Sequence, residues 1–242
     1  MSRITKAIIL AGGQGLRLRP LTNNIPKCLL KVGYYTILEI QMRWLWKHGV
    51  EHIIIAGGHG ADALMDFIAR KIWEEPGRKS VSLIIEHEKL GTSGAVFNIF
   101  RHFREEDLDS FFVVNGDILT DLDPQRLVDK LEARTLCVMS AVEMRSPYGI
   151  IQHDNDTVIG FAEKPVLKNI WINAGVYLFR NNIRRYLVSK GDLETDVFPK
   201  LASLRKIKLV KYSDVFWMSI DTVKDLKYAN EHANEIIERI LG

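Results

Sequence analysis

The sequence predicts an α/β protein with a doubly wound, mainly parallel sheet, because short apolar runs alternate with segments of helical periodicity. Helices are expected on both faces of such a sheet, and ligands are expected at the carboxyl ends of its strands. The four runs expected to form the parallel core are rich in β-branched residues and precede loops with Gly, Asp or Ser: Thr5–Leu10, His52–Ala56, Val81–Ile85 and Phe111–Asn115.

The expected helices have apolar side chains three and four residues apart. In the first helix this spacing runs from Ile37 to His48, and Gly49 supplies the stop. The same spacing predicts further helices at about residues 61–73, 93–103, 124–133, 193–203 and 222–240.

The second half of the chain predicts antiparallel strands beside the parallel core. Its strand-like segments are joined by turns such as Asp154-Asn155-Asp156: Leu136–Val142, Gly149–His153, Val158–Ala162 and Trp171–Phe179. The sequence has no linker rich in Gly, Pro or Ser, no internal repeat and no low-complexity tract. Residues 1–242 are therefore expected to form a single domain.

Composition narrows the classes of function. The 242 residues carry a formal net charge of +3, and most Lys and Arg alternate with acids, so no nucleic acid partner is expected. The N-terminal MSRITKAIIL lacks the long apolar core of a signal peptide, and no apolar run approaches the roughly 20 residues of a membrane span. Cys28 and Cys137 lie far apart and outside any metal-binding motif. We therefore expect a cytoplasmic location, with no membrane partner.

A Gly-rich loop directly follows the first expected strand. Gly12, Gly13 and Gly15 free the backbone to approach a bulky anion, so that N–H groups can cradle a phosphate. Arg17 adds a planar fork suited to phosphate oxygens, and Lys27 adds a compact positive charge. The alternative interpretation is that the glycines only form a tight turn and that the cations are solvated.

The loop does not fit the two best-known Gly-rich fingerprints. Leu18 stands where GxGxxG requires its third Gly, and no Gly precedes a Lys-Ser or Lys-Thr pair as a P-loop requires. A dinucleotide-dependent oxidoreductase is therefore disfavoured.

Residues 10–29, LAGGQGLRLRPLTNNIPKCL, resemble the signature of the sugar-1-phosphate nucleotidyltransferases, L-A-G-G-x-G-x-R-L-x-P-L-T followed by P-K-x-L. The resemblance continues through shorter motifs along nearly the whole chain: Gly91-Thr92-Ser93-Gly94-Ala95, Asn115-Gly116-Asp117, Tyr148-Gly149, Glu163-Lys164-Pro165, Asn173-Ala174-Gly175 and Asp221. It implies a Rossmann-like nucleotidyltransferase domain whose added antiparallel strands lie on the sugar-binding side.

The sequence departs from this family at two places. Lys31 and Tyr35-Thr36 stand where the family often has Pro and Lys-Pro, which affects local loop geometry but not the reaction. Family members with a C-terminal left-handed β-helix domain are considerably longer, so no such domain is expected.

The resemblance implies an enzyme that joins a nucleoside triphosphate to a sugar 1-phosphate and releases pyrophosphate, by direct in-line attack. The residues that it implies for binding the nucleotide are Leu10, Ala11, Gly12, Gly13, Gly15, Arg17, Lys27, Glu86, Gly91, Thr92 and Asp117. Those that it implies for the sugar phosphate are Gly149, Glu163, Lys164 and Asn173. Arg17, Lys27, Asp117 and Lys164 are the expected catalytic residues.

Magnesium is the expected cofactor, because both substrates of such a transfer are anions. Mg²⁺ needs only one or two carboxylates beside phosphate and water oxygens, and Asp117 and Asp221 each follow an expected strand. The alternative is that these residues form turns or cap helices, which fits Asp221 before Thr222. Asp121 and Asp123, which lie nearby, are interpreted as turn and cap residues.

The sugar-phosphate side is expected at Glu163 and Lys164. Glu163 can accept hydrogen bonds from sugar hydroxyls, and Lys164 can neutralise the sugar phosphate and orient its attacking oxygen. Gly149 would let the backbone approach the sugar, and Asn173 offers both a donor and an acceptor. The alternatives are a solvated surface ion pair for Glu163 and Lys164, and a buried amide that bridges strands for Asn173.

The expected base is guanine, and the expectation rests on Glu86 at the end of a strand. An ionised carboxylate accepts hydrogen bonds only, and guanine presents two adjacent donors. GTP with mannose 1-phosphate is therefore the expected substrate pair, the sugar by the family's association with guanylyl transfer. UTP, or dTTP or CTP, with a glucose or hexosamine 1-phosphate is the alternative, and Glu86 could instead be a solvated residue.

Two further alternatives concern the whole protein. A regulatory homologue would bind a nucleotide sugar without turning it over, but it would not need the full set of cations and carboxylates. The chain can also form a homo-oligomer, which the sequence does not decide.

Overall fold

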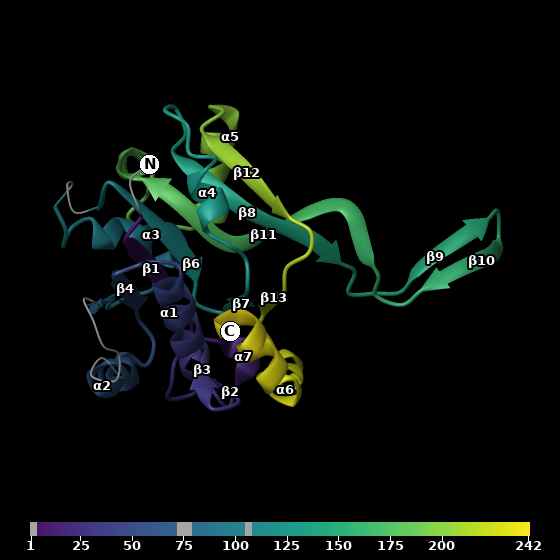
Figure 1. The fold of residues 1–242 in the computed structure, drawn as a ribbon, viewed down its shortest axis with the longest axis horizontal. Coiled ribbons are helices and arrows are strands. Elements are labelled where there is room, and N and C mark those ends of the chain that lie inside the picture. Colours follow the sequence, from purple (N-terminus) through teal and green to yellow (C-terminus); the bar gives the residue numbers. More distant parts are fainter. Residues whose placement is uncertain (1–3, 72–78, 105–107) are drawn as a thin grey trace.

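The computed structural model describes residues 4–71, 79–104 and 108–242. Its centre is a seven-stranded sheet in the order β12-β8-β11-β6-β1-β4-β5 (Figure 1). The strands of this sheet are β1 (Lys6–Ala11), β4 (His52–Gly57), β5 (Ser80–Ile85), β6 (Ser110–Asn115), β8 (Cys137–Arg145), β11 (Val166–Arg180) and β12 (Ile207–Tyr212). The four runs expected to form the parallel core correspond to β1, β4, β5 and β6.

Strand direction follows from the pairing. β1 is parallel to both β4 and β6, and β4 is parallel to β5. β11 is antiparallel to both β6 and β8, and β12 is parallel to β8. Every strand of this sheet except β11 therefore runs in the same direction, which confirms the mainly parallel sheet with an added antiparallel strand.

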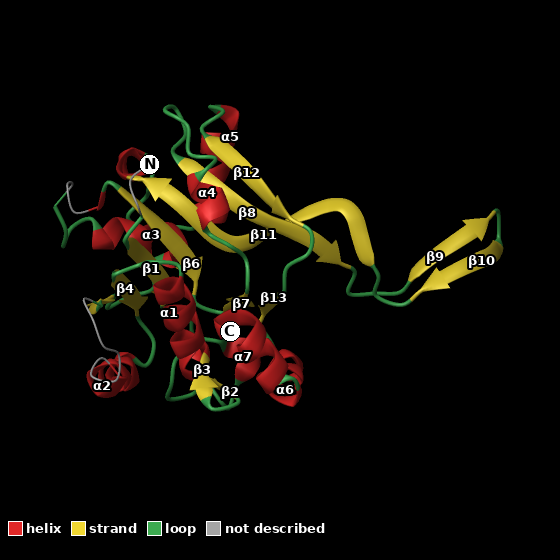
Figure 2. Ribbon diagram, in the orientation of Figure 1, coloured by secondary structure: helices red, strands yellow, loops and turns green. Residues whose placement is uncertain are grey.

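Three pairs of short strands lie outside this sheet (Figure 2). They are β2 (Lys31–Val32) with β3 (Tyr35–Thr36), β7 (Ile118–Thr120) with β13 (Trp217–Ser219), and β9 (Ile150–Asp154) with β10 (Thr157–Ala162). All three pairs are antiparallel.

The helices are α1 (Ile37–Lys47), α2 (Ala61–Lys71), α3 (Gly91–Ile99), α4 (Gln125–Val128), α5 (Phe198–Ser203), α6 (Val223–Glu231) and α7 (Ala233–Leu241). Thr36 caps α1 by accepting a hydrogen bond from the backbone N–H of Glu39. Within the described residues, no helix has the length and apolar character that crossing a membrane requires.

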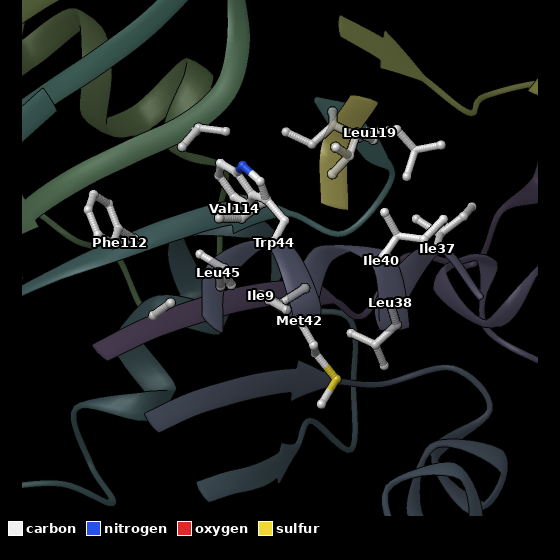
Figure 3. Packing of buried hydrophobic residues seen from close by; sticks show 14 of the residues in the cluster. Ile9, Ile37, Leu38, Ile40, Met42, Trp44, Leu45, Phe112, Val114 and Leu119 are labelled. Atoms are coloured by element: carbon white, nitrogen blue, oxygen red, sulfur yellow. The ribbon is translucent and has the colours of Figure 1, made fainter. Parts of the chain in front are cut away.

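The core is divided by the sheet into two clusters of buried side chains. On one face, Ile9 of β1 packs in a cluster with α1 and α7, and Figure 3 shows Trp44 and Leu45 of α1 in this cluster with Val114 of β6. On the other face, Ile8 packs in a cluster with buried residues of α3 and α5. Neighbouring residues of β1 thus point to opposite faces, both covered by helices, as in a doubly wound fold.

The structure corrects several expected helices. The helix expected at residues 222–240 is two helices, α6 and α7, which meet at His232, where the backbone is not helical. Its apolar spacing was misleading because both helices bury the same stripe, from Ala229 through Ile236 to Ile240, against one core.

Three other helices are shorter than their apolar spacing suggests. Residues 124–133 contain only the four-residue α4, and residues 193–203 contain a π-helical turn, Leu193–Val197, before α5. α3 ends at Ile99, short of residue 103. Residues 72–73 of the expected second helix lie outside the described residues.

A long projection leaves the sheet where β8 ends. We call residues 147–170 the arm; it contains the hairpin of β9 and β10 and the first residues of β11. Figure 1 shows the hairpin extending away from the rest of the molecule. Every residue of the arm is exposed or half-buried, so the arm has no hydrophobic core of its own.

Candidate active site

The carboxyl ends of the parallel strands open into a cavity of about 620 Å³, lined by the Gly-rich loop after β1 and by residues after β4 and β5. A second cavity, of about 220 Å³, lies beside it and reaches the end of β6. Gly12, Gly13, Glu86, Lys89 and Asp117 line both. The ligand site is therefore at the edge of the sheet where the fold class predicts it.

Two glycines of the loop have a definite structural task. Gly15 has a φ of 58°, a left-handed conformation that favours glycine. A Cβ at Gly12 would lie 2.5 Å from Oε1 of Glu86, so any side chain there would collide with this carboxylate. The hydroxyl of the buried Thr22 holds the loop by donating to the carbonyl of Gly15 at 2.8 Å.

The structure brings together the cations and carboxylates expected from the sequence. Nζ of Lys27 lies 2.9 Å from Oδ2 of Asp117 and 2.9 Å from Oδ1 of Asp221. Nη2 of Arg17 lies 2.8 Å from the same oxygen of Asp221. We call these four residues the charged cluster. All four line the larger cavity, next to the Gly-rich loop.

Pairing of β7 with β13 explains why two aspartates 104 positions apart in sequence share one lysine. Ile118 of β7 is opposite Ser219 of β13. One residue further, the backbone N–H of Ile220 donates to the carbonyl of Asp117 at 2.8 Å. Asp117 therefore lies in the turn between β6 and β7, and Asp221 directly follows this short ribbon, outside the central sheet.

The carboxyl group of Asp221 is held ionised by its neighbours. Partial burial alone would raise the pKa of Asp221, but the Lys27 ammonium and the Arg17 guanidinium outweigh this effect and hold the pKa below its usual value. The side chains of Asp117 and Asp221 are 33% and 31% exposed, so a ligand in the cavity can reach them.

The carboxylate pair fits the needs of a magnesium ion. Within residues 4–71, 79–104 and 108–242, no group of three or more His, Cys, Asp or Glu side chains is arranged to hold a metal ion. Magnesium does not need such a cage, because it binds to one or two carboxylates and takes its other ligands from phosphates and water. Asp117 and Asp221 offer such a pair, because both point at Lys27 from the cavity wall.

Glu86 lies between the two cavities. Its backbone N–H donates to the carbonyl of Gly57 at 2.8 Å, which fixes the residue beside the end of β4. Its carboxylate faces two glycines, since a Cβ at Gly58 would lie 2.8 Å from its Oε1. Burial raises the pKa of Glu86, while a hydrogen bond from the backbone of Leu90 and the charge of Lys89 act in the opposite direction.

Other residues expected at the nucleotide occupy different positions. Leu10, Gly91 and Thr92 line the smaller cavity, whereas Ala11 lines neither cavity and its side chain is buried. Thr92 also has a structural task, because its hydroxyl donates to Glu194 at 2.8 Å and accepts from the backbone of the following residue 193.

The residues expected at the sugar phosphate are not all at the cavities. Gly149, Glu163 and Lys164 lie in the arm, and neither cavity is lined by a described residue of the arm. Glu163 and Lys164 form an ion pair of 3.4 Å with each other. Their side chains are 62% and 46% exposed, so within one chain they form the solvated pair that was the alternative interpretation.

Asn173 lies in β11 and is exposed, so the buried amide considered as an alternative is wrong. Its side chain donates to the hydroxyl of Tyr177 at 2.6 Å and accepts from the backbone N–H of Gly175 at 3.0 Å. Gly175 in turn approaches Asn115, which lines the smaller cavity. Asn173 is therefore near this edge of the site, with its amide already hydrogen-bonded within β11.

The neighbouring acids Asp121 and Asp123 have structural partners. Asp121 accepts from the backbone of Phe216 at 2.7 Å and pairs with Arg239. Asp123 accepts from the backbone N–H of Gln125 at 2.9 Å, at the start of α4. Their interpretation as turn and cap residues is confirmed.

Two residues near the site were missed by the sequence interpretation. Gln41, which was counted only for helical periodicity, is buried and donates to the carbonyls of Asn115 and Ile118, both at 2.8 Å. It thereby fixes the turn that carries Asp117. A buried amide in an otherwise apolar helix face was the available signal. Lys89, which lines both cavities, gave no signal among other surface lysines.

Comparisons with known proteins agree with this geometry. The family model described as nucleotidyl transferase matches residues 6–236. The mannose-1-phosphate guanylyltransferase catalytic subunit beta of Danio rerio is 32% identical over 229 residues, 91% of this chain and 62% of that protein. The mannose-1-phosphate guanyltransferase of Candida albicans is 31% identical over 231 residues, with the same coverage. The chain thus spans about 62% of the length of these curated relatives.

Solved structures show the same fold. HddC from Yersinia pseudotuberculosis, which has also been solved in complex with GMP-PN, is 28% identical with a TM-score of 0.72, over 95% of this chain and all of that one. The inositol-1-phosphate CTP transferase from T. maritima is 19% identical with a TM-score of 0.73, over 99% of this chain and 97% of that one. The latter likeness concerns the fold alone.

Proposed function

Since the chain belongs to the nucleotidyl transferase family, we propose that it transfers a nucleotidyl group from a nucleoside triphosphate to a sugar 1-phosphate, with release of pyrophosphate. The observation that carries this proposal is the charged cluster, in which Lys27 lies 2.9 Å from both Asp117 and Asp221 beside the Gly-rich loop. A Gly-rich loop alone would suit many phosphates. The added carboxylate pair suits a phosphate that must also meet a metal ion.

In the proposed reaction, a phosphate oxygen of the sugar 1-phosphate attacks the α-phosphorus of the triphosphate. The new P–O bond forms as the bond to the bridging oxygen of pyrophosphate breaks, and no covalent enzyme intermediate is needed. Both reactants are anions, so the chain must neutralise charge and hold them in line. Backbone N–H groups of the Gly-rich loop, Arg17 and Lys27 would bind the triphosphate.

Asp117 and Asp221 would hold the magnesium ion. When bound, Mg²⁺ supplies positive charge that stabilises the phosphates and the leaving group. The chain itself contributes the placement, since Gln41 and the β7–β13 ribbon fix the backbone on both sides of Asp117.

GTP is the proposed nucleotide. Support comes from the half-buried carboxylate of Glu86, which faces the Gly-rich loop between the two cavities and can accept from the two donors of guanine. The relatives named mannose-1-phosphate guanylyltransferase and the HddC complex with GMP-PN support the same choice. Mannose 1-phosphate is the proposed acceptor, and UTP with a glucose or hexosamine 1-phosphate is the alternative. We also place the protein in the cytoplasm, because both of its cysteines are free and buried.

The test of the reaction is pyrophosphate release, measured with each of four nucleoside triphosphates against several sugar 1-phosphates. Release with one or more pairs, abolished by chelator, is the expected result. Nucleotide binding without release for any pair would instead indicate a regulatory homologue.

The test of the base is competition between equimolar GTP and UTP in the wild type and in Glu86→Gln. We expect the wild type to prefer GTP and the variant to lose about 1–3 kcal/mol of this preference, because a guanine donor loses its charged acceptor. A wild type that prefers UTP, or a variant with unchanged preference, would remove Glu86 as the base reader and the GTP assignment with it.

A further inference from the structure

The arm exposes apolar side chains that a finished surface would cover. Ile151 of β9 is directly opposite Phe161 of β10, and these side chains are 55% and 65% exposed. Val158 and Ile159 are 62% and 66% exposed in the same hairpin. A two-stranded hairpin without a third strand or a helix against it is marginally stable in water. The arm therefore needs a partner surface.

Backbone pairing fixes the direction in which the arm leaves the sheet. Beyond the last pair of the ladder, between Arg145 and Val166, the backbone N–H of Ser146 donates to the carbonyl of Pro165 at 2.9 Å. An ion pair of 2.9 Å between Lys168 and Glu143 braces the same base. Folding of the arm back onto its own cavity would break these contacts.

Glu163 and Lys164 are consequently far from the cavity of their own chain. In the β8–β11 ladder, Asn173 pairs with Ala141 and Val166 pairs with Arg145. Four residues of β8 separate these two pairs, which is about 13 Å at the rise of a strand. Glu163 and Lys164 lie beyond Val166, further from Asn173 and the cavity edge than a lysine side chain reaches.

We propose that the arm of each chain packs against a second copy of this chain, and that its Glu163 and Lys164 complete the sugar-phosphate side of that copy's cavity. The inference rests on the proposed function, because it assigns these two residues to the sugar 1-phosphate. The partner is a second copy because that copy has a cavity lacking these residues, whereas an unrelated protein would remove them from any site.

The size of the arm suits this partner. Its exposed and half-buried residues, 147–170, are about as many as the roughly 20–30 residues that each side of a stable interface contributes. A twofold dimer makes the same contact twice, so exchange of arms covers both hairpins and completes both cavities.

The first experiment measures the oligomeric state by sedimentation of the full chain. The wild type should be a dimer, and Phe161→Asp should be a monomer with an unchanged circular dichroism spectrum, because Phe161 contacts little in its own chain. Ile151→Asp serves as the second variant. Leu204→Asp, which changes a leucine that is 48% exposed outside the arm, is the matched control and should remain dimeric.

The second experiment mixes defects within one dimer. A chain with Lys27→Ala and a chain with Glu163→Ala and Lys164→Ala are co-expressed with different tags, and dimers carrying both tags are purified. Exchange of arms leaves one cavity with all its residues and one with both defects, so about half of the wild-type kcat/KM should return. Each variant alone should remain strongly impaired.

The outcomes separate the arm from the reaction. A monomeric wild type, or a mixed dimer as inactive as its parents, would overturn the exchange of arms. A wild type that releases no pyrophosphate with any substrate pair would contradict the proposed function, and sedimentation would still decide whether the arm binds a second copy.

Discussion

The charged cluster and the arm both contain a lysine beside a carboxylate, but they are held in different ways. Lys27 is 13% exposed and lies 2.9 Å from two aspartates whose backbones are fixed by the β7–β13 ribbon. Lys164 is 46% exposed and lies 3.4 Å from the neighbouring residue in sequence, Glu163. Exposed ion pairs are screened and contribute little, whereas buried and positioned charges act at full strength. The comparison teaches that residue type alone does not make a site; the elements holding the residue must orient it.

The largest effect should follow removal of a charge from the cluster. Asp117→Asn should lower kcat by about a thousandfold or more while the fold is preserved, because it removes a metal-binding carboxylate without changing the shape of the side chain. Asp221→Asn should also lower activity strongly. The measurement is pyrophosphate release at saturating Mg²⁺, together with circular dichroism. Turnover that persists in excess chelator would show that the metal assignment is wrong.

The second prediction separates the two cations of the cluster. Lys27→Ala and Arg17→Ala should each lower kcat/KM by at least about a hundredfold, close to 3 kcal/mol of lost charge stabilisation. The larger loss is expected for Lys27, because Arg17 is 70% exposed and contacts only one of the two aspartates. The measurement is steady-state kinetics of both variants. Wild-type kinetics in both would remove the phosphate-binding role of the loop.

The third prediction concerns the arm. Lys164→Ala should raise the KM for sugar 1-phosphate about tenfold and leave triphosphate binding nearly unchanged, because Lys164 is assigned to the sugar phosphate alone. Initial rates are measured with each substrate varied in turn. Equal losses for both substrates would place Lys164 with the cluster and erase the difference between the two regions.

The fourth prediction uses the half-buried Glu86. Since burial raises its pKa above the usual 4.5, its carboxylate is ionised above that raised pKa and becomes protonated as the pH falls through it. The GTP preference should therefore be present at neutral pH and decline at a higher pH than for an exposed glutamate. The ratio of kcat/KM for GTP and UTP is measured against pH. In Glu86→Gln the ratio should not change with pH, and the same decline in this variant would assign the titration to another group.

The smallest effect is expected at Cys28, which is next to Lys27 in sequence. Burial raises the pKa of its thiol to about 12, so the reactive thiolate is absent at neutral pH. Cys28→Ser should retain wild-type turnover, within about threefold of the wild type. Complete inactivation of a folded Cys28→Ser protein would reveal a role for the thiol in the cluster.

The parallel core could be predicted because its strands are buried on both faces. Runs such as Ile53–Ile55 are fully apolar, and nothing but a central strand buries them efficiently. The β7–β13 ribbon could not be predicted, since three-residue strands carry no period to detect. The sequence therefore suggested both Asp117 and Asp221 but not the pairing that brings them to one lysine.

The arm marks the other limit of the sequence. Its two strands were expected as Gly149–His153 and Val158–Ala162, and β9 and β10 occupy nearly the same residues. Its direction could not be predicted, because alternation of side chains describes the faces of a hairpin and not where it is attached. Proximity of Lys164 to the cavity was therefore an expectation from resemblance alone.

The ribbon that joins Asp117 to Asp221 has a consequence for the order of folding. Synthesis proceeds from the amino end, and the Gly-rich loop, Lys27 and Asp117 are all made early. β11 must then be inserted between β6 and β8, and β13 follows only at Trp217–Ser219. Contacts between residues so distant in sequence form slowly. A nascent chain therefore displays its phosphate loop well before it owns the second carboxylate, and the competence to bind a metal is the last property that it acquires.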